Sequence, residues 1–380
     1  MNKEQLLHLG DRALEYTREL IQCKSYNPPG NEKKAAQLAA QILEGAGFRT
    51  EIEEFEENRC NVIGIYGNDD DIALIFNGHL DVVPAFGQWT CSPDSGEQKD
   101  GKIWGRGSCD MLGGCAAILA AAEELKSTVP HPDRGIMVLL VSDEEDKNRG
   151  IRHILRTRKL HADGAVVAEP TECQVQLGNR GFSSYYIRTT GEACHASEPW
   201  NGENAIYKMG GIIRRFEKYA ESLTDVRDSY LGQATACIGT IKGGIRLNTV
   251  PDECVIEVER RLLPGEDEVQ IKEEIQQIAG RDSEVLSRSF FPASLIEKEH
   301  PLVKNCVEAL TAIQGREPVI SVFKACTEAS MFSVYCGIPT LLLGPGSLKQ
   351  AHRVDEFCRT DDIRDCAGAF LFLMCQSLRQ

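Results

Sequence analysis

Histidines and carboxylates recur in this sequence shortly after short apolar runs. The residues concerned are His79 and Asp81 after run 72–76, Glu144 and Glu145 after 136–141, Glu169 after 165–168, and His352 after 339–343. The carboxyl ends of parallel strands meet at one edge of a sheet, where ligands bind, so these side chains are expected to converge. Histidine and carboxylate donors suit a divalent cation, with zinc the leading choice. The sequence therefore predicts a metal centre at this edge.

Asp110 is a further candidate ligand. It stands in the glycine-rich segment 105–114, directly before a predicted helix over 111–126. Backbone N–H groups and the helix dipole keep a carboxylate ionised at such a position, and one aspartate can bridge two ions. Taken alone, a histidine after a strand is more often a polar residue with local partners than a ligand, an acidic run such as 143–146 is usually a solvated loop, and Glu169 before a proline is typical of a turn. Their joint occurrence at successive strand ends favours the metal centre.

The apolar runs themselves are typical of strands buried on both faces. Because helical patterns separate them, they indicate a mainly parallel sheet with helices on both faces. After Pro292 the same rhythm returns, in helix 301–314, strand 318–323, helix 328–335, strand 339–343 and a final helix 361–378. The sequence thus predicts an α/β catalytic domain made of residues 1–177 and 291–380.

The pattern changes between the two parts of this domain. It predicts strands 182–190, 234–242, 253–262 and 283–290, with helices 203–222 and 266–280. The order strand, helix, strand, strand, helix, strand is that of a ferredoxin-like α+β domain. We therefore expect such a domain to be inserted over residues 178–290.

The composition restricts the classes of partner. A net charge of −15, from 42 Lys and Arg against 57 Asp and Glu, argues against nucleic acid and anionic membranes. No apolar run reaches the roughly 18 to 20 residues that a membrane-spanning helix requires. The first residues lack the unbroken apolar stretch of a signal peptide, which predicts a cytoplasmic protein. The 15 cysteines include no C-x-x-C pair and are expected to be free thiols that fill the core.

Ordered segments along nearly the whole chain resemble a family of dinuclear zinc hydrolases. That family contains acetylornithine deacetylase, succinyl-diaminopimelate desuccinylase, aminoacylase-1 and bacterial glutamate carboxypeptidases. The segments are GHLDVVP at 78–84, GRGSCDMLGG at 105–114, DEE at 143–145, AEPT at 168–171, NTVPD at 248–252, RLLPGE at 261–266 and GPGSLKQAHRVDEF at 344–357. Within the family, CTEAS at 326–330 looks most like acetylornithine deacetylase, whereas GNRGF at 178–182 looks more like the desuccinylases.

The resemblance implies a zinc-peptidase-like fold and a role for each candidate. His79, Asp110 and Glu169 would hold one zinc ion, and Asp110, Glu145 and His352 the other, with cobalt or manganese as alternatives. Asp81 would accept a hydrogen bond from the imidazole of His79. Glu144 would be the general base. The peptide bond between Asp110 and Met111 is expected to be cis.

The inserted domain would act as a lid and dimerisation domain. In such a homodimer His195 would reach the partner's active site and stabilise the developing oxyanion. The resemblance also implies substrate contacts from Arg180, Asn248, Arg261 and Gly346, with a surface or structural salt bridge as the alternative for the arginines.

The expected function is hydrolysis of the amide bond of a small N-acyl-L-amino acid, with N-acetylornithine as the first substrate. Succinyl-diaminopimelate, another acyl amino acid or a small dipeptide is the alternative, motivated by Arg180. A non-catalytic metal-binding or amino-acid-binding protein is a third reading. Such a protein should lack a ligand or the base, whereas all five ligands and Glu144 are present.

Overall fold

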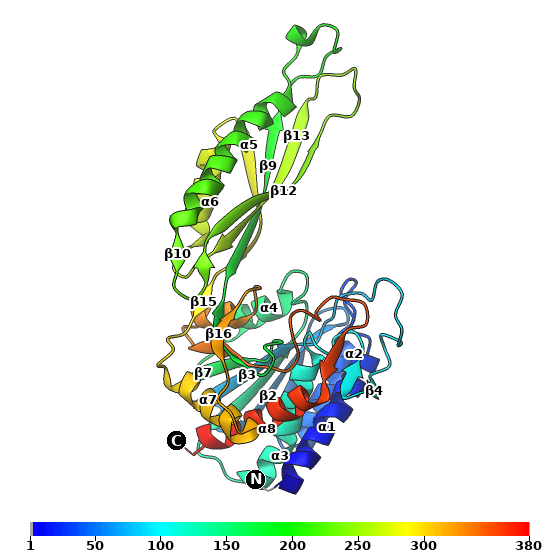
Figure 1. The fold of residues 1–380 in the computed structure, drawn as a ribbon, viewed down its shortest axis with the longest axis vertical. Coiled ribbons are helices and arrows are strands. Elements are labelled where there is room, and N and C mark those ends of the chain that lie inside the picture. Colours follow the sequence, from blue (N-terminus) through cyan, green and yellow to red (C-terminus); the bar gives the residue numbers. More distant parts are fainter. Residues whose placement is uncertain (1–2, 380) are drawn as a thin grey trace. The chain divides into compact units, whose positions relative to one another are not determined.

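The computed structural model describes residues 3–379 of the chain and divides them into two compact units (Figure 1). In its described parts, the first unit comprises Met1–Gly178, Leu295–Phe323 and Thr327–Gln380, and the second comprises Asn179–Ser294 with Lys324–Cys326. Each unit has a hydrophobic core of its own. No helix within residues 3–379 is long and apolar enough to cross a membrane.

A mixed sheet forms the centre of the first unit, with strand order β1-β2-β6-β3-β7-β17-β8-β15 and with β16 paired to β8. Its middle strands are mutually parallel, and they are β6 (Gly135–Val141), β3 (Ile72–His79), β7 (Gly164–Val167) and β17 (Thr340–Leu342). Every residue of these four strands is buried, which explains their continuous apolar character. The predicted mainly parallel sheet is confirmed at the centre of this unit.

The flanking strands complete the sheet. β2 (Arg59–Gly67) is antiparallel to both β6 and β1 (Arg49–Glu56). On the other side lie β8 (Val175–Asn179), β15 (Ser294–Leu295) and β16 (Ile320–Phe323), and β8 is antiparallel to β17. A separate small sheet joins β4 (Glu97–Lys99), β5 (Lys102–Trp104) and β18 (Phe357–Arg359). Neither the β1–β2 hairpin nor this small sheet was predicted from the sequence.

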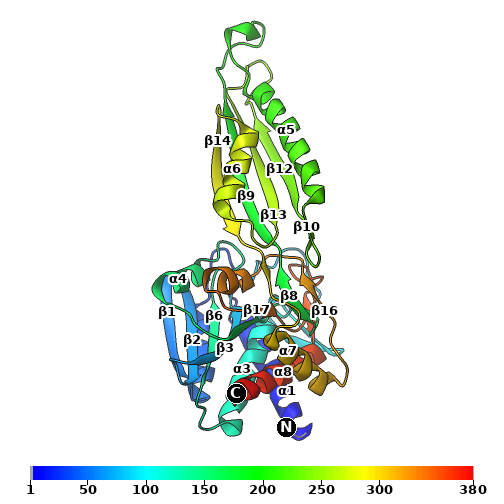
Figure 2. The same ribbon diagram turned by 90° about the vertical axis from the view of Figure 1, so that its left-hand side faces the viewer.

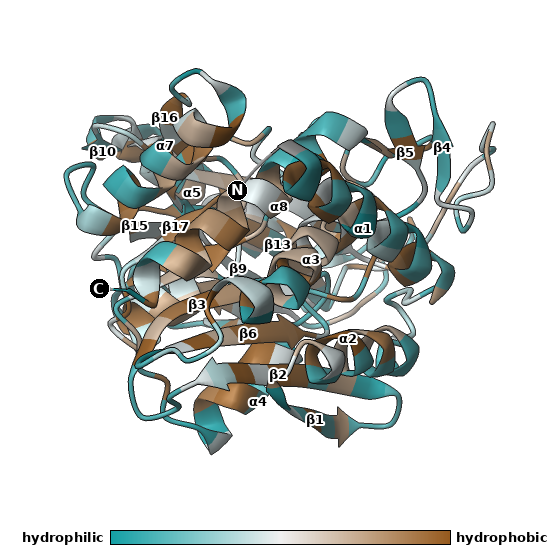
Figure 3. Cartoon of the chain, turned by 90° about the horizontal axis from the view of Figure 1, so that it is seen from below, coloured by the Kyte–Doolittle hydropathy of each residue, from teal (hydrophilic) through white to brown (hydrophobic). Residues whose placement is uncertain are grey.

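Helices cover both faces of the main sheet. α1 (Lys3–Gln22), α3 (Leu112–Thr128) and α8 (Thr360–Ser377) pack together, and α7 (Pro301–Gln314) packs against α8. Figure 3 shows α1, α3 and α8 on one side of the sheet and α4 (Arg149–Thr157) on the other. α2 (Lys33–Gly45) lies against β1 and β2. The helix expected over 328–335 contains a π-helical turn, Met331–Tyr335, which ends before Gly337 at φ +68°.

The second unit has the predicted ferredoxin-like order. Its elements are β9 (Gly181–Thr190), α5 (Ala205–Ser222), β12 (Thr235–Gly243), β13 (Glu253–Leu262), α6 (Glu268–Ala279) and β14 (Ser283–Phe291). The strands form an antiparallel sheet in the order β12-β13-β9-β14, and both helices cover one face of it (Figure 2). β9 and β13 alternate buried with less buried residues, as expected for a sheet covered on one side. A short hairpin, β10 (Arg227–Asp228) and β11 (Gly232–Gln233), precedes β12.

Candidate metal centre

The carboxyl ends of the parallel strands bring the candidate ligands of the first unit together. β3 ends at His79, β6 leads into the loop with Glu145, and Glu169 stands two residues after β7. Asp110 lies just before α3, whose first turn packs closely against the end of β7. A Cβ atom at Gly114 in this turn would come within 2.2 Å of the Ala168 carbonyl oxygen. Glycine is therefore needed at this position for the start of α3 to pack against Ala168, the residue before Glu169.

Direct contacts link four of these side chains. His79, Asp110 and Glu145 each offer a ligand atom, and these three atoms all lie within 4.8 Å of one another. His79 Nε2 is 3.3 Å from Asp110 Oδ1. His352 Nε2 is 3.0 Å from Glu145 Oε1 and 3.5 Å from Asp110 Oδ2. The side chain of His79 is 1% exposed and that of His352 is 52% exposed. His79 therefore lies at the buried side of the cluster, and His352 lies at its solvent-exposed side.

The cluster carries an excess of negative charge in a buried place. Burial raises the pKa of Glu169 and Glu144 well above the usual range, and Asp110 or neighbouring glutamates raise it further. Burial and Asp110 also raise the pKa of Glu145. Burial alone would lower the pKa of His79, but its hydrogen bond with Asp110 and the nearby carboxylates raise it well above its ordinary value. A cation would offset the repulsion among these carboxylates, and the five candidate ligands could hold divalent metal ions, namely His79, Asp110, Glu145, Glu169 and His352.

Asp81 supports both the histidine and the glutamates. Its carboxylate accepts hydrogen bonds from the backbone N–H groups of Glu144 at 3.0 Å and of Glu145 at 3.1 Å. The imidazole Nδ1 of His79 lies 2.9 Å from the backbone oxygen of Asp81, and 3.7 Å from its carboxylate. The imidazole contact therefore differs from the expected one, because the main-chain oxygen takes the place of the carboxylate. The carboxylate instead anchors the loop that carries Glu144 and Glu145.

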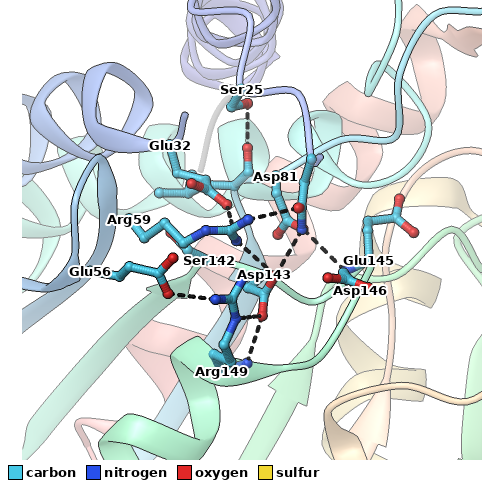
Figure 4. Close-up of polar contacts among 12 residues, drawn as sticks. Ser25, Glu32, Glu56, Arg59, Asp81, Ser142, Asp143, Glu145, Asp146 and Arg149 are labelled. Carbon is cyan, nitrogen blue, oxygen red and sulfur yellow. Dashed lines mark hydrogen bonds and ion pairs between the residues drawn. The ribbon is translucent and has the colours of Figure 1, made fainter. Parts of the chain in front are cut away.

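A network of ion pairs and hydrogen bonds around the buried Asp143 supports this loop (Figure 4). Asp143 accepts hydrogen bonds from Arg59 at 2.7 Å, from Arg149 Nε at 2.7 Å and from Asn27 at 3.0 Å. Asn27 also donates to the Asp81 carboxylate at 2.8 Å, so the network continues to the residues beside the candidate metal centre. Asn27 and Arg59 were not predicted as functional residues, because nothing in the sequence beyond their residue type points to this role.

Glu356 anchors the segment that carries Asp110. It is fully buried, pairs with Arg106, and accepts hydrogen bonds from the backbone N–H groups of Cys109 at 2.9 Å and Asp110 at 3.2 Å. Burial raises the pKa of Glu356 to about 7, against the opposing effect of Arg106. The peptide bond between Asp110 and Met111 is cis, as expected. Arg106 and Glu356 both lie in segments that resemble the family, and this resemblance could have identified them as functional residues.

Glu328 is a second buried carboxylate that the sequence analysis left without a role. It is 1% exposed, and within residues 3–379 neither of its carboxylate oxygens forms a hydrogen bond of good geometry. Burial raises its pKa to about 8, although His79 and Asn77 act in the opposite direction. Glu328 lies in the CTEAS segment, so family likeness could have singled it out.

The remaining candidates are found in several places. Gly346, at φ +81°, belongs to the first unit, where a Cβ atom would come within 2.7 Å of Cys109 Sγ. Four others belong to the second unit, and they are His195, Arg180, Asn248 and Arg261. His195 is exposed and its Nδ1 lies 2.7 Å from Ser197 Oγ.

The three other residues of the second unit have local partners. Arg180 donates to the Leu231 carbonyl, and Arg261 pairs with Glu259 at 2.6 Å. Asn248 accepts a backbone hydrogen bond from Ala196, next to His195 in the chain.

Comparison with known proteins decides the family. A model described as "Peptidase family M20/M25/M40" matches residues 75–376. The chain belongs to this family. The predicted family resemblance is thereby confirmed, and the chain is a metal-dependent hydrolase of the M20 type.

Two relatives illustrate the range of similarity. A Staphylococcus aureus (strain Mu50) protein named "Probable succinyl-diaminopimelate desuccinylase" is 28% identical over 391 residues, covering 94% of this chain and 97% of the relative. The acetylornithine deacetylase of Proteus mirabilis (strain HI4320) is 31% identical over 331 residues and covers 84% of each chain. Among solved structures, an M20 family metallo-carboxypeptidase from Sulfolobus solfataricus is similar in fold, with a TM-score of 0.82, 18% identity, and coverage of 97% of this chain and all of that chain.

Proposed function

We propose that this enzyme hydrolyses the amide bond of an N-acyl-L-amino acid, releasing a carboxylate and a free amine. The observation that carries the proposal is the contact cluster of His79, Asp110 and Glu145, with Glu144 as the neighbour of Glu145 in the chain. The names of both relatives describe hydrolysis of an acylated amino acid, which supports the same reaction.

Two divalent ions, with zinc as the first choice and cobalt or manganese as alternatives, fit the donor set. In this proposal Asp110 serves both ions, joined by His79 and Glu169 on one side and by Glu145 and His352 on the other. Histidine nitrogen and carboxylate oxygen are donors that zinc accepts, and a cation offsets the repulsion among the buried carboxylates. When bound, such a metal pair polarises the scissile carbonyl group and lowers the pKa of water.

Glu144 is proposed to move the proton. Burial raises the pKa of Glu144 well above the usual range, and a carboxylate with a raised pKa is a stronger base in its ionised form. It would accept a proton from the attacking water and then donate it to the departing amine. Asp81 would keep this base in place, because it binds the backbone N–H groups of both Glu144 and Glu145.

N-Acetylornithine is the first candidate substrate, and succinyl-diaminopimelate is the second, favoured by the relative that covers 94% of the chain. Another acyl amino acid or a small dipeptide remains a further alternative. Arg180, Arg261, Asn248 and Gly346 are the proposed contacts of the substrate, and a guanidinium group suits its carboxylate by bidentate geometry.

A substrate panel tests this proposal. Purified zinc-loaded enzyme is offered N-acetylornithine, N-succinyl-diaminopimelate and a dipeptide, and release of the free amine is measured. Glu144→Gln serves as a matched control, because it should keep its bound metal while its rate falls by about 10²- to 10⁴-fold. Glu145→Gln should lose metal instead. Absence of hydrolysis across the panel in a fully metal-loaded enzyme would contradict the proposed function.

We further propose that the first unit is the catalytic domain and that the second is a lid through which two chains form a homodimer. Exposed apolar side chains on β12 and the loop after it support an interface there, with Ile241 54%, Ile245 86% and Leu247 fully exposed. Surface of this kind commonly marks an interaction site. His195 lies beside this loop, since it forms a backbone bridge with Thr249.

Mixing two inactive variants tests whether His195 serves the partner's site. If chains of His195→Ala and Glu144→Ala exchange freely, about half of the dimers are mixed, and one of the two sites in each mixed dimer is intact. Activity should then recover to about a quarter of the wild-type value. Activity that stays at the level of the separate variants would show that His195 acts within its own chain.

A further inference from the structure

A cavity of about 750 Å³ lies in the first unit, apart from the acidic cluster. One wall is formed by the last turns of α4 and the segment after it, within residues 152–161. The facing wall is formed by the π-helical turn, through Met331, Tyr335 and Cys336. None of the lining residues is a candidate metal ligand. The size is that of a pocket for a small organic molecule, which commonly measures roughly 300–1,000 Å³.

The charge of this cavity is opposite to that of the whole chain. Five of its lining residues are basic, and they are Arg152, Arg156, Arg158, Lys159 and His161. Among the described residues 3–379, no aspartate or glutamate lines it, although the chain carries a net charge of −15. A local positive field in an acidic protein attracts anions and repels cations.

Two of the basic side chains are available to a ligand. Arg158 already pairs with Glu51 at 2.7 Å and Glu53 at 2.5 Å on β1. Arg156 and Lys159 are exposed and form no ion pair within residues 3–379. A ligand with two acidic groups would therefore find two cations that are not neutralised by the protein.

Apolar side chains complete the cavity. Leu160 and Met331 are 6% and 0% exposed and form its inner part, while the ring of Tyr335 is half exposed. An anion without an apolar body, such as free sulfate, would leave this surface in contact with water. The combination favours an organic anion over an inorganic one.

We propose that this cavity binds a small organic dianion, with its acidic groups held by Arg156 and Lys159 and its apolar body against Leu160 and Tyr335. Carboxylates and phosphates share this chemistry, since a guanidinium group can bind either through two hydrogen bonds. The site is distinct from the proposed active site, and its existence does not depend on the reaction proposed above.

Calorimetric titration of the full chain with benzene-1,3-disulfonate tests the proposal, because sulfonates are poor ligands for divalent metals. The charge-reversed variant Arg156→Glu/Lys159→Glu should bind at least about tenfold more weakly than wild type. The matched control Lys34→Glu/Lys304→Glu changes the net charge equally at two exposed helix positions, and it should bind within about twofold of wild type. Phenyl phosphate and phthalate, titrated in the same way, distinguish a phosphate from a dicarboxylate ligand.

Equal weakening in the cavity variant and the control would overturn the proposal, since it would show a general charge effect. Failure of all three probes to bind wild type would also overturn it. The neutral variant Arg156→Gln/Lys159→Gln guards against misfolding of the charge-reversed chain and should show an intermediate loss. Binding that survives unchanged in both cavity variants would place the anion elsewhere, for instance at the metal centre, and would likewise refute the proposal.

Discussion

Replacement of Asp143 by asparagine should destabilise the first unit much more than the same replacement of the nearby Asp146. The Asp143 carboxylate is 0% exposed and receives hydrogen bonds from Arg59, from the side chain and backbone of Arg149, and from Asn27. Asparagine keeps the shape of the side chain but removes its negative charge. Its NH2 group would also replace a carboxylate oxygen and face the N–H donors of these partners. Arg59, whose side chain is 3% exposed, would then be a buried cation with Glu32 as its remaining acidic partner.

The size of the effect follows from this burial. Removing one partner of a buried ion pair typically costs about 3–5 kcal/mol, because the other charge is left uncompensated. Glu32 is a poor substitute, since burial raises its pKa to about 7 and it is therefore partly protonated at neutral pH. Asp146→Asn is a matched control, because Asp146 is 42% exposed and its pair with Lys147 at 3.3 Å is solvent-screened. Such an exposed pair contributes about 0–1 kcal/mol.

Urea unfolding followed by tryptophan fluorescence measures the difference. The three tryptophans are Trp89 and Trp104 in the first unit and Trp200 in the second, so a Trp200→Phe background reports on the first unit alone. With a slope of about 3 kcal/mol per M, the midpoint should fall by about 1 M or more for Asp143→Asn. A shift equal to that of Asp146→Asn would refute the account of the network.

Three further substitutions test the supports of the metal centre. Glu356→Gln should weaken zinc retention by about 10- to 100-fold, measured against a chromophoric chelator, because it leaves Arg106 unpaired beneath the Asp110 segment. Gly114→Ala should lower the free energy of unfolding by about 1–3 kcal/mol in a urea titration, because its Cβ atom overlaps the Ala168 carbonyl. Glu328→Gln should change that free energy by less than about 1 kcal/mol, since the raised pKa favours the neutral acid, and a loss above about 3 kcal/mol would show an ionised, paired carboxylate.

The sequence was most informative where local pattern and topology coincide. Strands β3, β6 and β7 are buried on both faces, so their apolar runs could be recognised and the residues after them predicted to share an edge. The structure places His79 and Glu145 from two of those ends in one contact cluster with Asp110. The ferredoxin-like order of the second unit could also be predicted, because strands such as β9 and β13 alternate buried with less buried residues.

Contacts between distant segments could not be predicted from pattern. Glu356 meets Cys109 and Asp110 across more than 240 residues of chain, and Asn27 joins Asp81 to Asp143. β1 escaped prediction because its half-exposed, acidic sequence has no continuous apolar run. His79 contacts the main-chain oxygen of Asp81 and not its carboxylate. This too could not be predicted, because the carboxylate is held by hydrogen bonds from Asn27 and from the backbone of Glu144.

Hydrolysis of N-acetylornithine or succinyl-diaminopimelate as a function of bound metal tests the central claim most directly. The chain is dialysed against a chelator, its metal content is verified by atomic spectroscopy, and zinc is then titrated back while amine release is measured. The account predicts no turnover in the metal-free chain and recovery that saturates at two ions per chain, because the buried carboxylates and histidines have no other means of activating water. Full hydrolytic activity in a verified metal-free sample would contradict it.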